Sequence, residues 1–428
     1  MNSGAFNDSD CDDSDYDDSD YDDSDRDDAY LNPTLYNALQ DCATRDAIRR
    51  IHLAVTDSEL LRSVIVPLTS NSEELRSNSI ESFILRNYPR TPVDVSDFFA
   101  RHHFPELRRL ELSTFIISSS SWDHLSSHTS VLTTLNLSFP SPPFPTALQL
   151  LSILVSNPAL QRVTFNWFAV PNNDGSGPSF RVQLHHLKEL DLTGDVRHVI
   201  TLLHQLDLPR NIEELTLDFH DCDVTDISQT IGPYLRDHLQ CHSRPQDGLG
   251  LFVEFPYYAD AQKITLCAGD AGGINFSAPE QIDTFVAITV VLNRALGADV
   301  RERAALDLIT HVPREEVVYF HTRNDPVPLE DVSTQFPNVR ALSIKTGYLS
   351  AAFPESTLAG DGRIFPSLEH ILLKNMILRG GGWGPLMTFL ARRVSSGHRL
   401  DTLMIVDSPF MSPEVMEGIG GMVRKLKL

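Results

Sequence analysis

The chain has 428 residues, of which 41% are hydrophobic, and it carries a net charge of −23. The apolar fraction is ample for a large core, while the acidic balance argues against general nucleic-acid binding, because phosphate contacts require Lys and Arg. The five cysteines are widely spaced and form no C-x-x-C pair, which fits reduced thiols in the cytosol or nucleus. The sequence shows neither the apolar core of a signal peptide nor an apolar run long enough to span a bilayer, so we expect no membrane insertion.

Residues 1–29 form a low-complexity segment built on a repeated Asp-Asp-Ser-Asp unit, with thirteen Asp and one Arg between positions 8 and 28. Such a segment repels itself and buries little apolar surface, so we expect a disordered acidic tail. Its serines carry Asp at positions +1 and +3, which suits acid-directed kinases; the plainer alternative is a solvating tail. The candidate phosphorylation sites are Ser9, Ser14, Ser19 and Ser24.

Residues 30–428 are predicted to form one domain around a recurring L-x-x-L-x-L segment. Clear copies span 107–112, 132–137, 187–192 and 212–217, and looser copies begin at 160, 339, 368 and 400. A repeat of this kind at roughly 25 to 30 residues predicts a leucine-rich repeat solenoid. The expected fold is therefore an α/β horseshoe with a parallel concave sheet and a helical convex side.

Helices are predicted between several of these strands, where apolar residues recur at three- and four-residue spacings. The predicted helices are Ala147–Val155, Val196–Leu206, Ile227–Leu239, Trp383–Val394 and Pro413–Leu426. Ser412 is a good cap for the last of them, because Pro follows it at the first helical position.

The region from about 240 to 335 breaks the regular pattern. Strands are expected at Leu249–Phe255, Ile264–Cys267 and Val317–Thr322. Helices are expected at Ile282–Leu296 and Arg301–His311. We expect the repeat to resume at Val339.

The leucines of each repeat point inward, so function is expected at the alternate, outward positions of the strands. Exposed aromatic residues there are candidate anchors for a protein partner. Four carboxylates on neighbouring strands favour a docking surface for a basic segment; the alternative is an ordinary solvated face. The candidate protein-binding residues on the concave face are Asn136, Asn166, Trp167, Glu189, Asp191, Glu214, Asp218 and Phe219.

No motif of the sequence supports catalysis. The glycine-rich stretch 379–384 lacks the Lys and Ser/Thr of a phosphate-binding loop. The pairs His102-His103 and His185-His186 would point in opposite directions in a strand, which is poor for sharing a metal. We therefore expect a monomeric, non-enzymatic protein without catalytic, cofactor-binding or metal-binding residues.

Several stretches resemble one known family. They include Tyr88–Phe99 (YPRTPVDVSDFF), Phe104–Leu110 (FPELRRL), Leu187–Asp195 (LKELDLTGD) and Ile309–Tyr319 (ITHVPREEVVY). Their layout over residues 45 to 410 is similar to that of the F-box-like leucine-rich repeat proteins of mushroom-forming (basidiomycete) fungi.

The resemblance implies a protein that recognises substrates for a cullin-type ubiquitin ligase, with a ligase adaptor and a target protein as partners. The F-box that would recruit the adaptor, a Leu-Pro-x-Glu-Ile/Leu-Leu segment, is not found ahead of the repeats. Two alternatives remain open. One is a regulator or scaffold resembling the GTPase-activating leucine-rich repeat proteins, whose acidic tail follows the repeats. The other is a degenerate paralogue that lacks the F-box.

Overall fold

The computed structural model describes sixteen stretches of the chain. They are residues 49–55, 80–87, 93–101, 103–139, 144–167, 181–209, 212–222, 224–241, 248–254, 263–271, 283–292, 298–323, 329–353, 364–378, 382–409 and 411–428. The acidic segment 1–29 and its serines Ser9, Ser14, Ser19 and Ser24 lie outside these residues.

A single sheet of 15 strands dominates the described structure, in the order β1-β2-β4-β6-β7-β9-β11-β14-β13-β12-β15-β16-β17-β18-β19. The strands up to the middle of the sheet are β1 (Arg50–Val55), β2 (Ser82–Asn87), β4 (Arg109–Ser113), β6 (Thr134–Ser138), β7 (Arg162–Asn166), β9 (Glu189–Asp195) and β11 (Glu214–Cys222). The others are β12 (Leu249–Glu254), β13 (Lys263–Asp270), β14 (Asp283–Leu292), β15 (Val317–Arg323), β16 (Ala341–Tyr348), β17 (His370–Ile377), β18 (Leu400–Val406) and β19 (Val423–Lys427).

Helices occupy most of the connections between these strands. They include α4 (Ser96–Arg101), α5 (Ser119–His128), α6 (Ala147–Ser156), α7 (Val196–His204), α8 (Val224–Asp226), the π-helical turn η2 (Ile227–Ile231), α9 (Gly232–Cys241), α10 (Ala298–Thr310), α11 (Leu329–Gln335), α12 (Leu349–Ala352), α14 (Gly384–Ser395) and α15 (Pro413–Met422). Two short ladders, β3 (Val93–Asp94) with β5 (Phe115–Ile116) and β8 (Val182–Gln183) with β10 (Leu206–Asp207), lie outside the main sheet.

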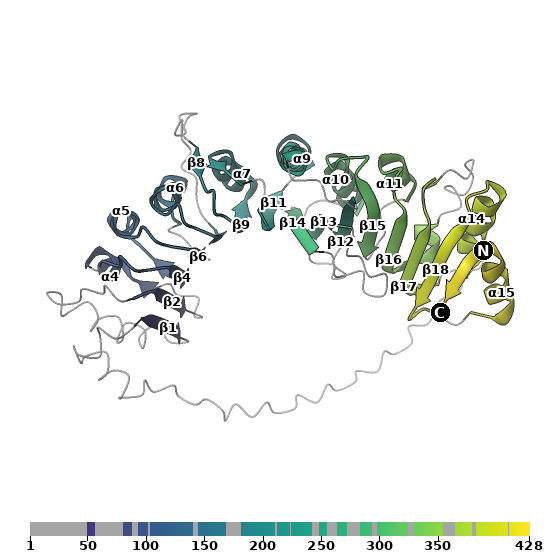
Figure 1. The fold of residues 1–428 in the computed structure, drawn as a ribbon, viewed down its shortest axis with the longest axis horizontal. Helices are drawn as coiled ribbons and strands as arrows, with labels where there is room; N and C mark the ends of the chain where they lie inside the picture. The colour runs from purple at the N-terminus through teal and green to yellow at the C-terminus, as the bar shows by residue number, and fades with distance from the viewer. Residues whose placement is uncertain are drawn as a thin grey trace, which may run out of the picture.

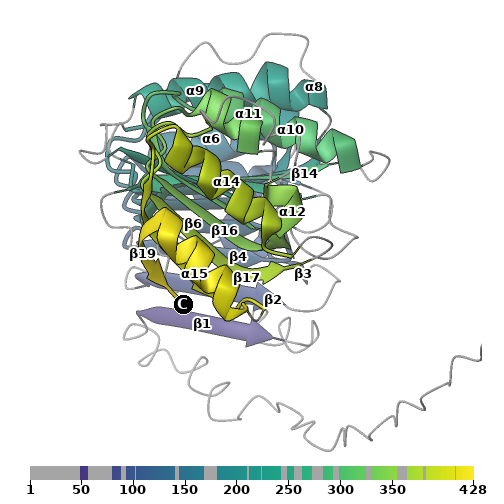
Figure 2. The same ribbon diagram turned by 90° about the vertical axis from the view of Figure 1, so that its right-hand side faces the viewer.

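The sheet follows an arc, with the helices along its outer side and the strands along its inner, concave side (Figure 1). Seen from the end that carries β19, α14 and α15 lie side by side against the sheet (Figure 2). The architecture is thus a mixed α/β structure with a large, mostly parallel sheet, which is compatible with a solenoid. None of the described helices is long and apolar enough to cross a membrane.

The period of two along each strand explains the layering. In β9, Leu190 and Leu192 are 1% and 0% exposed, while Glu189 and Asp191 are only partly buried. Parallel pairing in register places Leu190 beside Leu215 of β11, so apolar side chains line up towards the helices. The result is one continuous core under the outer helices and a polar concave face on the other side.

Side chains cap several of the outer helices, among them α6. The hydroxyl of Thr146 accepts a hydrogen bond from the backbone N–H of Gln149, and the side-chain oxygen of Gln149 accepts one from the N–H of Thr146, forming a capping box for α6. Asn157, followed by a proline, ends this helix and is fully buried. The predicted helix at 147–155 is therefore confirmed, as are those near 196 and 383.

In the middle of the sheet, one strand runs opposite to its neighbours. β13 runs antiparallel to both β12 and β14, whereas β14 is parallel to β11 and β12 is parallel to β15. The predicted strands near 249, 264 and 317 and the helix near 301 are confirmed. The prediction of a helix at 282–296 is wrong, because residues 283–292 form β14.

The sequence of β14 explains this correction. The segment Asp283–Leu292 is rich in Val, Ile and Thr, whose branched side chains pack well on a pleated sheet. Val286, Ile288 and Val290 are buried, while Ala287 and Thr289 between them are only partly buried. This alternation has the period of a strand, so the apolar run belongs to the core face of the sheet.

The last predicted helix is too long. α15 is capped by Ser412, whose hydroxyl accepts a hydrogen bond from the N–H of Val415, as expected, but it ends at Met422. Residues 423–427 instead form β19, which pairs in parallel with β18. Val423 is buried and Leu426 is partly buried, while Arg424, Lys425 and Lys427 are exposed, so this border strand covers only part of the core.

Candidate functional site on the concave face

A polar groove of about 260 Å³ crosses the concave face over five neighbouring strands, β4, β6, β7, β9 and β11. Its floor consists of side chains that alternate with the buried leucines of these strands. The parallel register arranges them in two rows across the sheet. The first row is Arg109, Thr134, Arg162, Glu189 and Glu214, and the second is Glu111, Asn136, Thr164, Asp191 and Thr216.

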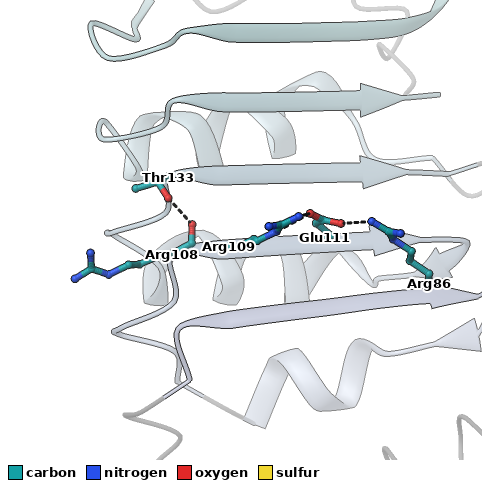
Figure 3. A network of polar contacts seen from close by, with 5 residues as sticks. All are labelled: Arg86, Arg108, Arg109, Glu111 and Thr133. Carbon is teal, nitrogen blue, oxygen red and sulfur yellow. Dashed lines mark hydrogen bonds and ion pairs between the residues drawn. The ribbon is translucent and has the colours of Figure 1, made fainter. Parts of the chain in front are cut away.

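The β4 end of the groove is balanced in charge. Glu111, which is only 5% exposed, receives hydrogen bonds from Arg86 Nη2 at 2.9 Å and from Arg109 Nε at 2.7 Å, and it forms an ion pair with each (Figure 3). Burial favours a higher pKa for this carboxyl, but the hydrogen bonds and charges of Arg86 and Arg109 outweigh it and hold the pKa below its ordinary value. Glu111 therefore stays ionised and fixes both guanidinium groups along the strand.

An exposed ion pair bridges the middle of the groove. Arg162 Nη2 on β7 lies 2.9 Å from Glu189 Oε1 on β9, and these two residues are direct partners in the ladder. Their side chains are 62% and 33% exposed, so solvent screens the pair and it contributes little to stability. Both groups remain accessible to a molecule in the groove.

The β11 end of the groove is acidic. Burial, together with repulsion from the carboxylates of Asp218 and Glu214, raises the pKa of Asp191 to about 6. Glu189 and Glu214 are also direct partners across β9 and β11, where like charges destabilise the ladder. Negative charge is thus concentrated on two neighbouring strands of the concave face.

Trp167 lies just beyond β7, next to this acidic end. Its backbone is left-handed, with a φ of 62°, and its N–H donates a hydrogen bond of 2.8 Å to the carbonyl oxygen of Thr193. The indole stacks on the ring of His220, with centroids 4.7 Å apart, and His220 Nε2 lies 3.7 Å from Asp218 Oδ1. With 36% of its surface exposed, Trp167 presents a fixed aromatic face beside carboxylates.

The structure brings most of the predicted binding residues together. Asn136, Glu189, Asp191 and Glu214 line the groove itself. Asn166 and Asp218 lie one step further along β7 and β11, in a third row that Thr193 joins between them, and Trp167 follows Asn166.

The prediction for Phe219 is wrong. This side chain is fully buried, because it has the same parity along β11 as Leu215 and Leu217 and therefore points into the core. The strand continues beyond the L-x-x-L-x-L segment, and the alternation continues with it. Phe219 is a packing residue and cannot serve as an anchor on the concave face.

Sequence reasoning missed part of the groove floor. Arg162, Thr134 and Thr216 were not among the predicted residues, although each occupies an outward position next to an inward leucine, valine or phenylalanine. The parity of the strand is the signal that identifies them. One group of described side chains has the spacing of metal ligands, and it lies outside the groove: His103, His124 and His128.

The fold and the groove define a class: a solenoid-like α/β protein with a curved, mostly parallel sheet and a polar concave face. No protein-family model matches the chain, and no curated protein matches it.

Proposed function

We propose that this chain is a leucine-rich repeat solenoid that binds a protein partner on its concave face, by accepting a basic segment at the acidic end of the groove. The concentration of Asp191, Glu214 and Asp218 on adjacent strands carries the proposal. A Lys or Arg side chain placed among these carboxylates relieves their mutual repulsion and gains charge-assisted hydrogen bonds.

The surroundings support a cation at this position. The exposed face of Trp167 lies next to the carboxylates and can contact the cationic end or the aliphatic stem of the same side chain. Arg162 and Arg109 lie towards the other end of the groove, where a carboxylate or a backbone carbonyl of the partner would meet them. The groove therefore distinguishes the two ends of a bound segment by charge.

Binding at this site is expected to depend on pH. A cation beside Asp191 lowers the raised pKa of its carboxyl, so binding near pH 6 releases a proton. The affinity for a basic segment should therefore increase between pH 5 and pH 7. Calorimetry in buffers with different ionisation enthalpies measures the released proton.

The experiment is a binding measurement with peptides that carry Arg or Lys at defined positions, each compared with the same peptide in which Gln replaces the basic residue. The double variant D191N/D218N should lose at least about tenfold in affinity, since one charge-assisted contact contributes about 1.5–3 kcal/mol. The matched control D207N/E213Q removes the same charge at two exposed positions outside the groove and should bind as the wild type does. Equal affinity of both double variants for the basic peptides would contradict the proposal.

The resemblance to F-box-like leucine-rich repeat proteins supports a more specific proposal, in which the bound protein is a target of a cullin-type ubiquitin ligase. The test is co-purification from cells with the wild type and with D191N/D218N. Recovery of the cullin adaptor with both proteins, and of a shared target with the wild type alone, supports ligase substrate recognition. Recovery of a small GTPase in place of the adaptor favours the GTPase-regulator alternative.

A further inference from the structure

Three histidines from two parts of the chain converge on the outer side of the fold, away from the concave groove. His124 and His128 lie one turn apart on α5, and His103 lies in the connection between α4 and β4. One ring nitrogen from each of the three lies within 4.8 Å of the other two. The ring centroids of His103 and His128 are 3.8 Å apart, and those of His124 and His128 are 4.0 Å apart.

We propose that His103, His124 and His128 form a binding site for a divalent transition metal, Zn²⁺. Three imidazole nitrogens are a sufficient protein ligand set for Zn²⁺, and solvent supplies the fourth position. A donor set of nitrogens alone favours Zn²⁺, Ni²⁺ or Cu²⁺ over Mg²⁺ and Ca²⁺, which prefer oxygen.

The spacing of the two helical histidines suits a shared metal. Residues four apart on an α-helix lie on the same face, so His124 and His128 present their rings to the same side of α5. Tetrahedral zinc with Zn–N bonds of about 2.0–2.1 Å needs its nitrogens about 3.4 Å apart. The ring nitrogens of the three histidines lie within 4.8 Å of one another, so side-chain rotations of these solvent-accessible rings can bring them to the shorter spacing that zinc requires.

The backbone under each ligand is fixed by buried neighbours. Phe104, next to His103, is 2% exposed and belongs to an aromatic cluster with Phe83, Phe98 and Phe99. Because the backbone next to His103 is held by this packing, binding a metal costs less conformational entropy at His103.

The α5 side is held equally well. Trp122 and Leu125 anchor the helix in the core, at 3% and 1% exposure. At its end, Thr129 Oγ1 donates a hydrogen bond of 2.8 Å to the carbonyl oxygen of Leu125 and accepts one of 3.2 Å from Nδ2 of the buried Asn157. His128 is therefore presented from a fixed helical end, and a bound metal would join α5 to the connection that follows α4.

The protonation state of His128 is compatible with metal binding. Burial lowers the pKa of His128, and the rings of His124 and His103 lower it further by repulsion. Neutral imidazole, the form that donates a lone pair to a metal, is thereby favoured at neutral pH.

The test is metal titration of the full chain after treatment with a chelator. Co²⁺ is followed by its visible absorption, and Zn²⁺ is followed by calorimetry and by its displacement of Co²⁺. We expect one site with the intense absorption of tetrahedral Co²⁺ in the wild type. In the double variant H124Q/H128Q this site should be lost, with a decrease in Zn²⁺ affinity of at least about tenfold.

A matched control separates this site from other histidines of the chain. H185Q/H186Q removes two exposed histidines that lie outside the cluster and should retain the wild-type affinity and spectrum. The single variant H103Q changes one exposed residue of the connection between α4 and β4. It therefore tests the site without a substitution in α5. The proposal is overturned if the wild type gives no tetrahedral Co²⁺ spectrum, or if H103Q and H124Q/H128Q, folded as judged by circular dichroism, bind Zn²⁺ as tightly as the wild type.

Discussion

The concave face differs between the two halves of the sheet. In the first row of the groove, the side chains of Arg109, Arg162 and Glu189 on β4, β7 and β9 are open to solvent, at 50%, 62% and 33% exposure. On β15 and β16 the equivalent row is closed, because Tyr319 and Ala341 are 1% and 4% exposed. The next row is closed as well, because His321 and Ser343 are 0% and 1% exposed. The antiparallel strand β13 lies between the two halves.

In the closed half, His321 and Ser343 pair with each other. His321 Nδ1 lies 2.9 Å from Ser343 Oγ, within hydrogen-bond distance, and the imidazole stacks on Phe252 with ring centroids 4.5 Å apart. The open half instead keeps repelling carboxylates within reach of solvent. The comparison indicates that outward-facing strand positions are accessible to another molecule in the first half and are packed within the protein in the second.

The largest expected effect concerns the core that both halves share. Leu190 on β9 and Leu373 on β17 are 1% and 0% exposed. Leu190→Ala and Leu373→Ala should each lower the free energy of unfolding by about 2–5 kcal/mol, through lost burial and the cavity that remains. Denaturant titration measures both, and a cost below about 1 kcal/mol for either variant would show that the two halves do not share one packing scheme.

The next effect distinguishes the two concave faces directly. His321→Ala removes a buried ring and leaves the hydroxyl of Ser343 without this partner, so we expect a loss of about 2–4 kcal/mol in stability. Thr164→Ala, at an open position of the groove, should change stability by no more than about 0.5 kcal/mol. Thermal or denaturant unfolding compares them, and similar losses for both variants would contradict the distinction.

A smaller effect is expected at Glu111, the one groove carboxylate that two arginines enclose. Glu111→Gln should cost about 1–2 kcal/mol at pH 7, because two charge-assisted hydrogen bonds become neutral ones. The folded-state pKa of Glu111 is lowered, so the carboxylate contributes stability above its unfolded pKa and loses it as the pH falls through the folded pKa. The difference between wild type and variant should therefore begin to shrink as the pH falls below about 4.5, the ordinary pKa of the carboxyl, and should vanish only below the lowered folded-state pKa. A constant difference at all pH values would argue against ionic stabilisation.

The smallest effect has the opposite sign. The pKa of Asp191 is raised to about 6, so its ionised form destabilises the folded state above that pH, and the penalty disappears below its ordinary pKa of 3.8. Asp191→Asn should stabilise the protein by about 1 kcal/mol at pH 7 after allowance for solvent screening, and by nothing measurable at pH 4. Melting temperatures across this range test the sign, and a destabilised variant at pH 7 would show that the carboxylate has a favourable partner.

Much of the fold was predictable because the alternation of inward apolar and outward polar residues along each strand can be read from the sequence. Leu187, Leu190 and Leu192 identify one repeat, and the helix at 147–155 follows from its apolar residues and Asn157-Pro158. The apolar run 283–292 was not predictable in the same way, since only its pairing with β11 and β13 decides that it forms a strand.

The candidate site was predictable in part for the same reason. The alternation along the strand identifies Glu189 and Asp191 as outward-facing. Continued from the inward-facing Leu217 to the second residue after it, the same alternation would have excluded Phe219. The link between Arg86, Arg109 and Glu111 depends on the register between β2 and β4, which the sequence does not specify. The approach of His103 to His124 and His128 depends on the packing of α4 against α5, so only the four-residue spacing of the helical pair was visible beforehand.

The strand β19 borders the sheet, where unpaired backbone groups invite another chain to extend it. Its sequence, Val-Arg-Lys-Leu-Lys, places three cations on that border. A second copy that docked edge to edge would bring like charges together before its backbone hydrogen bonds could form. The short basic strand thus opposes self-association of the sheet into longer assemblies.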